Sequence, residues 1–259
     1  MLNNHSDLAA ALSRRLPSAA LTDCRMERVS GLTGESWRIR TAESDWLARR
    51  MTTHKRMLGV DAAREYRILR RLSASGLAPR PVALISRWLL VEWTAGESLS
   101  PAQWLDCLDS GALARRLVQL HRLPRYGYPL ELHSRFEAYW QLTDPARRTP
   151  AWLRLHRMFM ASSLPRPLKI APLHMDVHAD NLIRDSRQAM RFIDWEYAAD
   201  GDFALELAAL FRGNEMSSGQ QRVFFTTLPG LRRGSFLGGD DAADRRLVAL
   251  GRLSDADVV

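Results

Sequence analysis

The fold class of this chain is decided by the stretch His174-Met175-Asp176-Val177-His178-Ala179-Asp180-Asn181, with Asp194-Trp195-Glu196-Tyr197 following it after a short apolar run. The pattern places an Asp, an Asn five positions on, and a second Asp at the end of that run. In kinase-type phosphoryl transfer, one Asp orients the acceptor hydroxyl, while an Asn and a further Asp coordinate magnesium ions. We therefore predict that Asp176 is catalytic and that Asn181 and Asp194 are catalytic metal ligands.

The segment between the two halves of this motif has the pattern of a hairpin. Two strand-like runs, 181–184 and 190–193, flank the polar turn Asp185-Ser186-Arg187. Such a hairpin would bring Asn181 and Asp194 to one place. The alternative is that these Asp and Asn residues only cap helices and make turns, as they do in many loops. Three coordinating groups at these intervals favour the catalytic interpretation.

Length and composition are those of a globular protein: 259 residues, 46% hydrophobic and 25% charged. The first residues lack the basic-then-apolar layout of a secretory signal, and no apolar run approaches the roughly 20 residues that cross a bilayer. The two cysteines, Cys24 and Cys107, fit no disulfide or metal framework. We therefore expect a cytoplasmic protein with no membrane partner.

The charge balance is basic, with a formal net charge of +8. Such a balance raises the hypothesis of a nucleic-acid partner. The arginines are spread through expected helices and loops, and no basic motif interleaved with aromatic residues stands out. A basic surface also attracts nucleotide triphosphates, so we do not expect nucleic acid to be the partner.

Periodicity divides the chain into three parts. Residues 1–96 have the pattern of a small β-rich lobe, with a helix expected over 61–72. Residues 97–211 are mainly helical, and Asp202 is expected to be the N-cap of a helix over 203–211. Strands are expected at 25–30, 36–41, 46–50, 81–85 and 88–92, and further helices at 102–108, 112–121, 136–142 and 151–160.

The composition changes after residue 211. Every Trp and Tyr lies at or before Tyr197, and about half of the glycines follow Phe211. We expect 212–259 to be an atypical tail that is either disordered or the product of a frameshift.

A phosphate-binding loop is expected in the β-rich part. Gly31, Thr33 and Gly34 lie between two expected strands. Glycine lets backbone N–H groups approach phosphate oxygens, and a hydroxyl can add a hydrogen bond. A plain hairpin turn is the alternative, because such turns use glycine too.

A cation for the nucleotide is expected on the strand 46–50. Arg49 lies where kinases place a phosphate-contacting lysine, and Glu65 on the following helix is its expected ion-pair partner. The alternative is an exposed surface pair of little energetic value. Arg50 competes with Arg49 for the role, because a shift of one residue in the strand register exchanges them.

Two further sets of residues are assigned by their context. The backbone of Val91-Glu92-Trp93 is expected to contact the adenine edge at the hinge, unless this is simply a strand end. His174 and His178 lie four apart in a loop, which is a weak metal pattern. We expect His174 to brace the catalytic loop by hydrogen bonds instead.

With their flanking residues, these motifs make the chain similar to the aminoglycoside phosphotransferase/choline kinase superfamily, and within it most similar to the bacterial thiamine kinases. The resemblance extends from about Leu21 to Ala209. It is carried by Tyr139-Trp140-Gln141, Thr143-Asp144-Pro145-Ala146-Arg147-Arg148-Thr149, Trp152-Leu153-Arg154, Pro165-Arg166-Pro167-Leu168, Pro172-Leu173-His174-Met175-Asp176-Val177-His178-Ala179, Ile193-Asp194-Trp195-Glu196-Tyr197-Ala198, Asp200-Gly201-Asp202 and Ala204-Leu205-Glu206-Leu207-Ala208-Ala209.

The resemblance implies an α+β, protein-kinase-like bilobal fold, with a small β-rich N-lobe and a larger, mainly helical C-lobe. It also implies ATP as co-substrate, Mg²⁺, and transfer of the γ-phosphoryl group to the primary hydroxyl of thiamine. By motif, Asp176 would orient and deprotonate that hydroxyl. Glu196 could face the cationic thiazolium, and Trp195 could add an aromatic contact. No protein partner is implied.

The chain departs from the family beyond about Phe211, where the family continues with aromatic-rich helices that are not found here. Two alternatives to a thiamine kinase therefore stay open. One is a kinase for another small hydroxyl acceptor, such as a choline-type amino alcohol or an aminoglycoside. The other is a nucleotide-binding protein that its altered C-terminus has inactivated.

Overall fold

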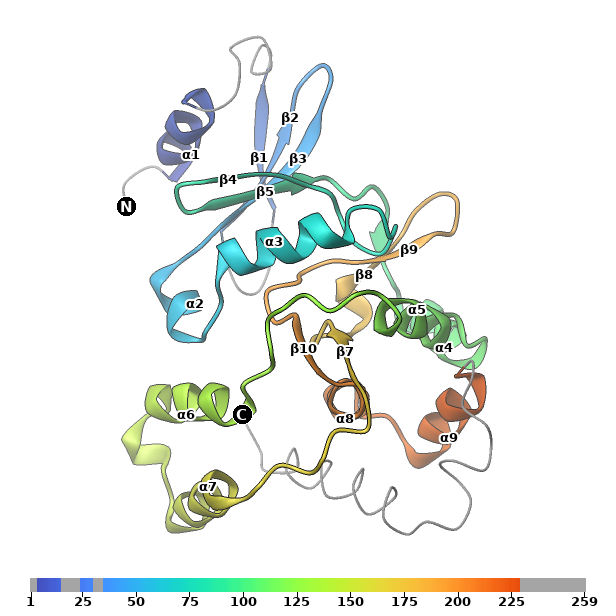
Figure 1. Ribbon diagram of the computed structural model, residues 1–259. Helices are drawn as coiled ribbons and strands as arrows, with labels where there is room; N and C mark the ends of the chain where they lie inside the picture. The colour runs from blue at the N-terminus through green and yellow to red at the C-terminus, as the bar shows by residue number, and fades with distance from the viewer. Residues whose placement is uncertain (1–3, 15–23, 30–34, 229–259) are drawn as a thin grey trace. The chain divides into compact units, whose positions relative to one another are not determined.

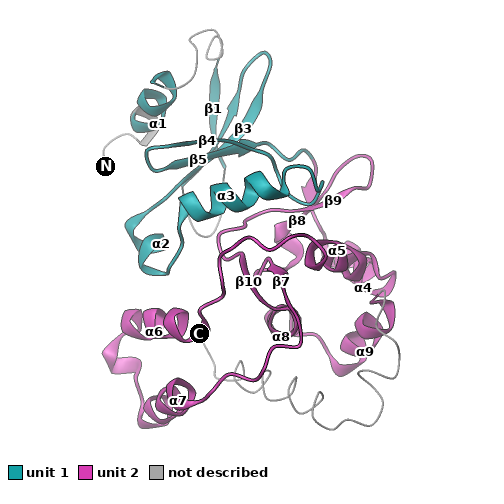
Figure 2. Ribbon diagram, viewed as in Figure 1, with its two compact units in different colours: residues 1–95 teal, residues 96–259 magenta. Residues whose placement is uncertain are grey.

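The structure, a computed structural model, describes residues 4–14, 24–29 and 35–228 (Figure 1). By its internal contacts the chain forms two compact units, Met1–Ala95 and Gly96–Val259 (Figure 2). The first unit is rich in strands and the second in helices. Among the described residues, no helix combines the length and the apolar character needed to cross a membrane.

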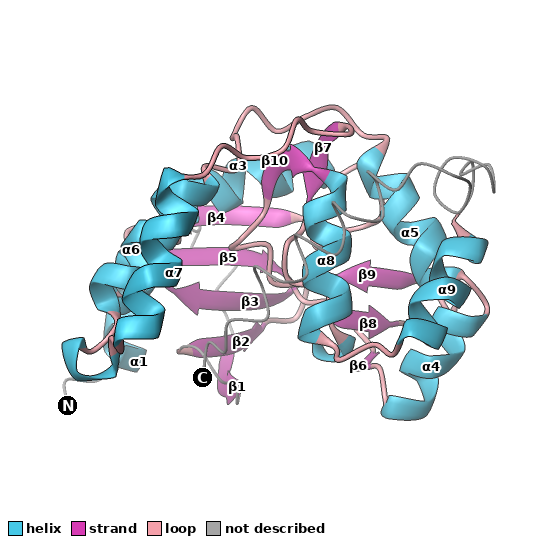
Figure 3. Cartoon of the chain, turned by 90° about the horizontal axis from the view of Figure 1, so that it is seen from below, coloured by secondary structure: helices cyan, strands magenta, loops and turns pink. Residues whose placement is uncertain are grey.

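The first unit is built on an antiparallel sheet whose strand order is β1-β2-β3-β5-β4 (Figure 3). The strands lie where the sequence predicts them: β1 (Arg25–Val29), β2 (Ser36–Arg40), β3 (Asp45–Arg50), β4 (Pro81–Ile85) and β5 (Trp88–Glu92). Strands β3 and β5 are central, and the register between them pairs Ala48 with Leu90 and Arg49 with Leu89. This register decides which side chains of the two strands share a face.

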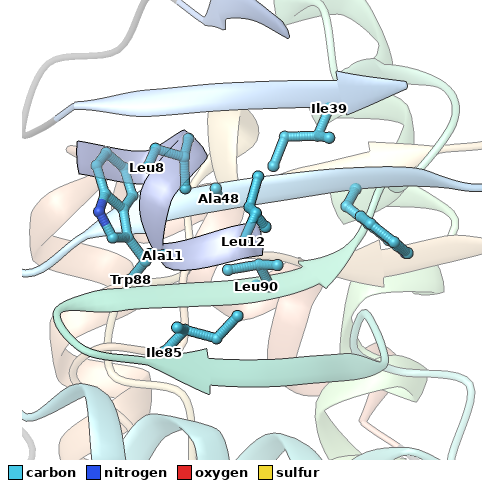
Figure 4. Close-up of a cluster of buried hydrophobic side chains, with 9 residues drawn as sticks. Leu8, Ala11, Leu12, Ile39, Ala48, Ile85, Trp88 and Leu90 are labelled. Atoms are coloured by element: carbon cyan, nitrogen blue, oxygen red, sulfur yellow. The ribbon is translucent and has the colours of Figure 1, made fainter. Parts of the chain in front are cut away.

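Helices cover the two faces of this sheet. Helix α1 (Asn4–Ser13), which the sequence analysis did not predict, packs Leu8 and Leu12 against Ala48 and Leu90 (Figure 4). Helix α3 (Ala62–Leu72) lies over the opposite face, with Asp61 as its N-cap. The short helix α2 (Thr53–Met57) precedes it. Because side chains alternate along a strand, neighbouring residues of β3 face different helices.

The second unit contains the remaining described helices and five short strands in two small sheets. The helices are α4 (Pro101–Asp109), α5 (Ala112–His121), α6 (Leu132–Leu142), α7 (Pro150–Ala161), α8 (Phe203–Gly213) and α9 (Ser218–Thr227), with 3-10 turns η2 (Pro145–Arg147) and η3 (Ala179–Asn181). The strands are β6 (Glu97–Ser98), β7 (Ile170–Leu173), β8 (Leu182–Arg184), β9 (Met190–Phe192) and β10 (Ala199–Asp202). One sheet has the order β6-β8-β9, and β10 pairs with β7.

The expected hairpin is formed by β8 and β9, which pair Leu182 with Phe192. Its turn is closed by the carboxylate of Asp185, which accepts the N–H groups of Arg187 and Ala189 at 2.9 Å each. Asp202 is the N-cap of α8, as the sequence predicts. The hairpin and the cap fix the two segments that flank the Asp194 motif.

The segment after residue 211 is described as far as Leu228. Helix α9 lies within it, and Ser217 with Gln220 forms a capping box at its N-terminus. The Phe224 ring is fully buried and meets the Phe211 ring of α8 edge-on, with 5.6 Å between centroids. Residues 229–259 of the segment that we expect to be an atypical tail lie outside the described residues.

Candidate active site

Asp176 and Asn181 are joined directly in the loop between β7 and β8. The Asn181 amide nitrogen donates to Asp176 Oδ2 at 2.8 Å and to the Asp176 carbonyl oxygen at 3.0 Å. The 3-10 turn η3 bends the chain so that these two residues, five positions apart, face each other. Because the Asn181 nitrogen is used in this way, its Oδ1 atom is the amide atom that remains to coordinate a cation.

Asp194 is brought to the same loop by the hairpin. The residue before it, Ile193, donates its N–H to the Asn181 carbonyl at 2.9 Å. The Ile193 carbonyl accepts from His174 Nε2 at 2.9 Å. Asp194 itself has a φ of 61°, in the left-handed region that few non-glycine residues adopt. These two hydrogen bonds thus hold Asn181 and His174 next to Ile193, the residue before Asp194.

His174 makes the bracing hydrogen bonds that we expect of it. Its ring is fully buried and packs against the rings of Phe192 and Trp195. Since Nε2 donates to a carbonyl, Nδ1 is the unprotonated nitrogen, and it accepts the Asp176 N–H at 3.2 Å. Burial lowers the pKa of His174, so the ring stays neutral and keeps this donor–acceptor pair.

Glu206 is the positioning residue that the sequence analysis missed. From α8 its Oε1 atom accepts the N–H groups of His174 and Met175 at 2.5 and 2.9 Å. Its other oxygen is hydrogen-bonded to His121 of α5. Met175 has a φ of 68°, so these two N–H groups converge on one oxygen. The only signal in the sequence is a single carboxylate in the otherwise apolar run 203–211.

The charge of Glu206 is compensated within the unit. Its side chain is 1% exposed. Burial alone would raise its pKa, but the hydrogen bond with His121 and the Met175 amide outweigh burial and lower it. The side chain is therefore an ionised acceptor at neutral pH, and it anchors the first part of the loop between β7 and β8.

Asp176 lies in a polar surrounding that favours its charged form. His178 Nε2 lies 3.7 Å from Asp176 Oδ2, and His178 Nδ1 lies 3.8 Å from Asp180 Oδ2. Burial would raise the pKa of Asp176, but His178, His174 and Asn181 together lower it. The same contact with Asp176 raises the pKa of His178. The Asp176 carboxylate is thus ionised at neutral pH.

Trp195 and Glu196 lie in the interior of the second unit. Trp195 is 1% exposed, and its indole N–H donates to the Phe192 carbonyl at 3.0 Å. Glu196 is 4% exposed. The packing of Trp195 against His174 gives this ring a part in supporting the loop. Their expected contact with the acceptor stays a prediction, and the structure adds that both side chains are buried.

In the first unit, Arg49 and Glu65 form the expected ion pair. Arg49 Nη1 lies 2.6 Å from Glu65 Oε1, and both side chains are largely buried. Arg49 occupies the face of β3 covered by α3, because Ala48 on the opposite face packs against α1. A buried pair of this kind differs from the exposed surface pair that was the alternative.

Arg50 is on the other face and has other partners. Its guanidinium contacts Glu35 at 2.6 Å and Asp7 of α1 at 3.8 Å. It also lies over the Trp88 ring. Because side chains alternate along β3, Arg49 rather than Arg50 lies on the face where Glu65 pairs with it.

The expected hinge residues are held by hydrogen bonds within the first unit. Glu92 N–H donates to the Arg80 carbonyl at 2.8 Å, and Trp93 N–H donates to the Asp45 carbonyl at 2.9 Å. An adenine edge would therefore be read by other backbone groups of this segment. Gly31, Thr33 and Gly34 lie outside the described residues.

The donor set at the catalytic loop fits magnesium. Mg²⁺ prefers oxygen ligands and is commonly bound by one or two protein groups together with substrate phosphates. Asn181 Oδ1 and the Asp194 carboxylate are such oxygens, and the hydrogen bond from Ile193 N–H to the Asn181 carbonyl links their two segments. No group of three or more His, Cys, Asp or Glu side chains suited to a metal occurs in the described part of the chain.

Comparison with known proteins places this chain in a family. The model of the phosphotransferase enzyme family matches residues 25–244. Thiamine kinase from Escherichia coli O139:H28 (strain E24377A / ETEC) is 45% identical over 151 residues, which are 58% of this chain and 53% of that enzyme. The chain thus spans about half the length of the curated relatives it matches. The family match continues past residue 211, through α9.

Solved structures resemble this one over almost its whole length. Choline kinase LicA from Streptococcus pneumoniae has a TM-score of 0.71 at 14% identity, covering 98% of this chain and 92% of that one. The streptomycin–ATP–APH(2")-IIa ternary complex has a TM-score of 0.64 at 14% identity, covering 91% and 87%. At such identities the likeness concerns the fold, and it confirms the predicted protein-kinase-like α+β class.

Proposed function

Because this chain belongs to the phosphotransferase enzyme family, we propose that it transfers the γ-phosphoryl group of ATP to the primary hydroxyl of thiamine. Identity of 45% with a thiamine kinase supports thiamine as the acceptor. The solved relative that holds ATP with streptomycin supports ATP as the donor. The observation that carries the proposal is the hydrogen bond from the Asn181 amide to Asp176, beside a hairpin that returns the chain to Asp194.

In this proposal Asp176 is the residue that receives the acceptor. Its Oδ2 atom is held by Asn181, so Oδ1 is the oxygen that accepts the hydrogen bond of the hydroxyl. A carboxylate kept ionised by its surroundings can take the hydroxyl proton as the oxygen attacks the γ-phosphorus and ADP leaves. His174 and Glu206 keep the carboxylate in place through the backbone.

Asn181 and Asp194 would hold Mg²⁺, which neutralises phosphate charge when it is bound. Arg49, oriented by Glu65, would contact the ATP phosphates with its guanidinium fork. Gly31, Thr33 and Gly34 would cover the phosphates, and the backbone around Glu92 and Trp93 would contact the adenine. Glu196 and Trp195 remain our proposal for the acceptor side.

The test is thiamine-dependent release of ADP from Mg-ATP by the 259-residue chain, with choline and an aminoglycoside as parallel acceptors. We expect turnover with thiamine alone. Turnover with choline or the aminoglycoside but not with thiamine would show that thiamine is the wrong acceptor. A folded chain that binds ATP and transfers to none of the three would be a nucleotide-binding protein without kinase activity.

A further inference from the structure

Helix α8 contacts the loop at a second point, at the residue that follows Asp176 in the chain. The side-chain nitrogen of Asn214 donates to the Val177 carbonyl at 2.8 Å. Asn214 is the C-cap of α8, eight positions after Glu206. Glu206 holds the N–H groups of the two residues before Asp176, and Asn214 holds the carbonyl of the residue after it.

The chemistry of the contact requires an amide at position 214. The Asn214 nitrogen donates to two carbonyl oxygens, those of Val177 and Leu210, each at 2.8 Å. Because both partners are acceptors, only the nitrogen of the amide can face them. The bond to Leu210 satisfies a carbonyl of the last helical turn, and the bond to Val177 reaches 37 residues back to the loop.

The position of Asn214 is fixed by the turn that follows α8. Met216 N–H donates to the Phe211 carbonyl at 2.9 Å, and Glu215 between them has a φ of 48°. Helix α9 then packs Phe224 against Phe211. The end of α8 is therefore held from both sides, which gives its C-cap a defined place relative to the loop.

We propose that Asn214 is a positioning residue that, together with Glu206, holds the backbone on both sides of the catalytic Asp176. The role rests on the proposed phosphoryl transfer, because it acts through Asp176. It follows that residues needed for catalysis extend past residue 211. They lie in the segment whose composition differs from that of the rest of the chain. Displacement of a catalytic carboxylate by up to about 1 Å can lower the reaction rate by as much as about a hundredfold.

Two variants separate the loop contact from simple capping of the helix. Asn214→Ala removes both hydrogen bonds. Asn214→Ser keeps a hydroxyl that can bond the Leu210 carbonyl one turn back, as Ser and Thr do in helices, but it is too short to reach Val177. The matched control is Ser73→Ala, which removes a C-cap hydrogen bond to the Arg70 carbonyl in α3 of the other unit.

We expect both Asn214 variants to lower kcat about ten- to a hundredfold while the KM values for ATP and thiamine stay within about twofold. Ser73→Ala should leave kcat unchanged. Amide hydrogen exchange in the folded protein gives a second readout that needs no turnover. In the Asn214 variants, the amides of residues 174–181 should exchange faster than in the wild type and in Ser73→Ala.

The outcomes distinguish this inference from the proposed function. If the wild type is inactive with every acceptor but the loop amides of the Asn214 variants exchange faster, the proposed function fails and the positioning contact stands. If the wild type turns over and the Asn214 variants match Ser73→Ala in kcat and in exchange, the inference is overturned. A rise in KM with unchanged kcat would overturn it as well.

Discussion

The two units hold their candidate site residues in opposite ways. In the first unit, Arg49 and Glu65 form one ion pair between a regular strand and a regular helix. In the second, Asp176 lies in an irregular loop, where Met175 has a left-handed backbone and Asp194 follows at the end of the hairpin. That loop is held by the buried carboxylate of Glu206 from α8, which is itself hydrogen-bonded to His121 of α5.

The difference shows what each arrangement depends on. The side on which Arg49 lies follows from the alternation of side chains along β3, which is a local property. The place of Asp176 follows from contacts over long stretches of chain, such as the one from Glu206 to His174. Strained backbone persists only where its surroundings determine it, so the second unit should be the more sensitive to loss of single polar contacts.

The largest effect is expected from Asp176→Asn, which keeps the shape but removes the base. We expect the transfer rate to fall about 10²- to 10⁴-fold, with ATP affinity unchanged. Asp180→Asn, an exposed neighbour in the same loop, is the control and should keep most of the activity. Turnover and ATP binding measured on both variants test whether Asp176 is the base. Equal losses in the two variants would show that general disturbance of the loop, rather than loss of the base, lowers the rate.

Glu206→Ala tests whether the polar anchor carries the stability of the second unit. It leaves the buried N–H of His174, the partly buried N–H of Met175 and the His121 ring without their acceptor. We expect the free energy of unfolding to fall by about 3 to 5 kcal/mol. Urea unfolding of this variant is compared with Glu131→Ala, which removes an exposed carboxylate. A loss below 1 kcal/mol would mean that the loop does not need this anchor.

The first unit is tested by the pair Arg49→Met and Arg50→Met. Each keeps an unbranched, largely apolar side chain in place of the aliphatic stem and removes the charged guanidinium. Only Arg49→Met should raise the KM for ATP, by about ten- to a hundredfold, since a charged hydrogen bond contributes about 1.5 to 3 kcal/mol. Steady-state kinetics at a temperature where both variants are folded gives the comparison. A rise with Arg50→Met instead would reverse the assignment of the two arginines.

The smallest effect concerns the pH dependence of stability through His174. Burial lowers the pKa of its folded form below the unfolded value of 6.5, so the unfolded chain binds the extra proton first. Stability from this group is present above pH 6.5 and is lost as the pH falls toward the folded value. The slope contributed is at most about 1.4 kcal/mol per pH unit.

The measurement is the free energy of unfolding in urea between pH 7.5 and 5. His174→Gln should show a shallower fall on acidification than the wild type. His54→Gln, at an exposed histidine of α2, should keep the wild-type slope. An unchanged slope in His174→Gln would show that the ring is not buried in solution as the structure has it.

What the sequence could predict follows the same division. The five strands of the first unit and most of the helices lie within a few residues of their expected positions, because periodicity and caps are local. The hairpin that returns to Asp194 was predicted from its turn residues and is confirmed. Helix α1 was missed, since its apolar face has meaning only once the sheet beneath it exists.

Residues that act through long-range contacts were not predicted. Glu206 and Asn214 resemble ordinary helix residues in the sequence, and only the fold brings them to the loop. For Trp195 the sequence predicts an acceptor contact from its place next to Asp194, and the structure adds that its ring is buried against His174. Burial is set by the whole unit and cannot be read from a motif.

The first residues of the second unit bear on any attempt to produce the two units separately. Strand β6 pairs Glu97 with Arg184, and a side chain at Gly96, whose φ is 129°, would collide with the Arg184 carbonyl. Leu99 N–H then bonds the carbonyl of Leu182, next to Asn181. A cut after residue 99 would therefore remove an edge strand from the sheet that contains the β8–β9 hairpin. An expression fragment of the helical unit therefore has to begin no later than Gly96.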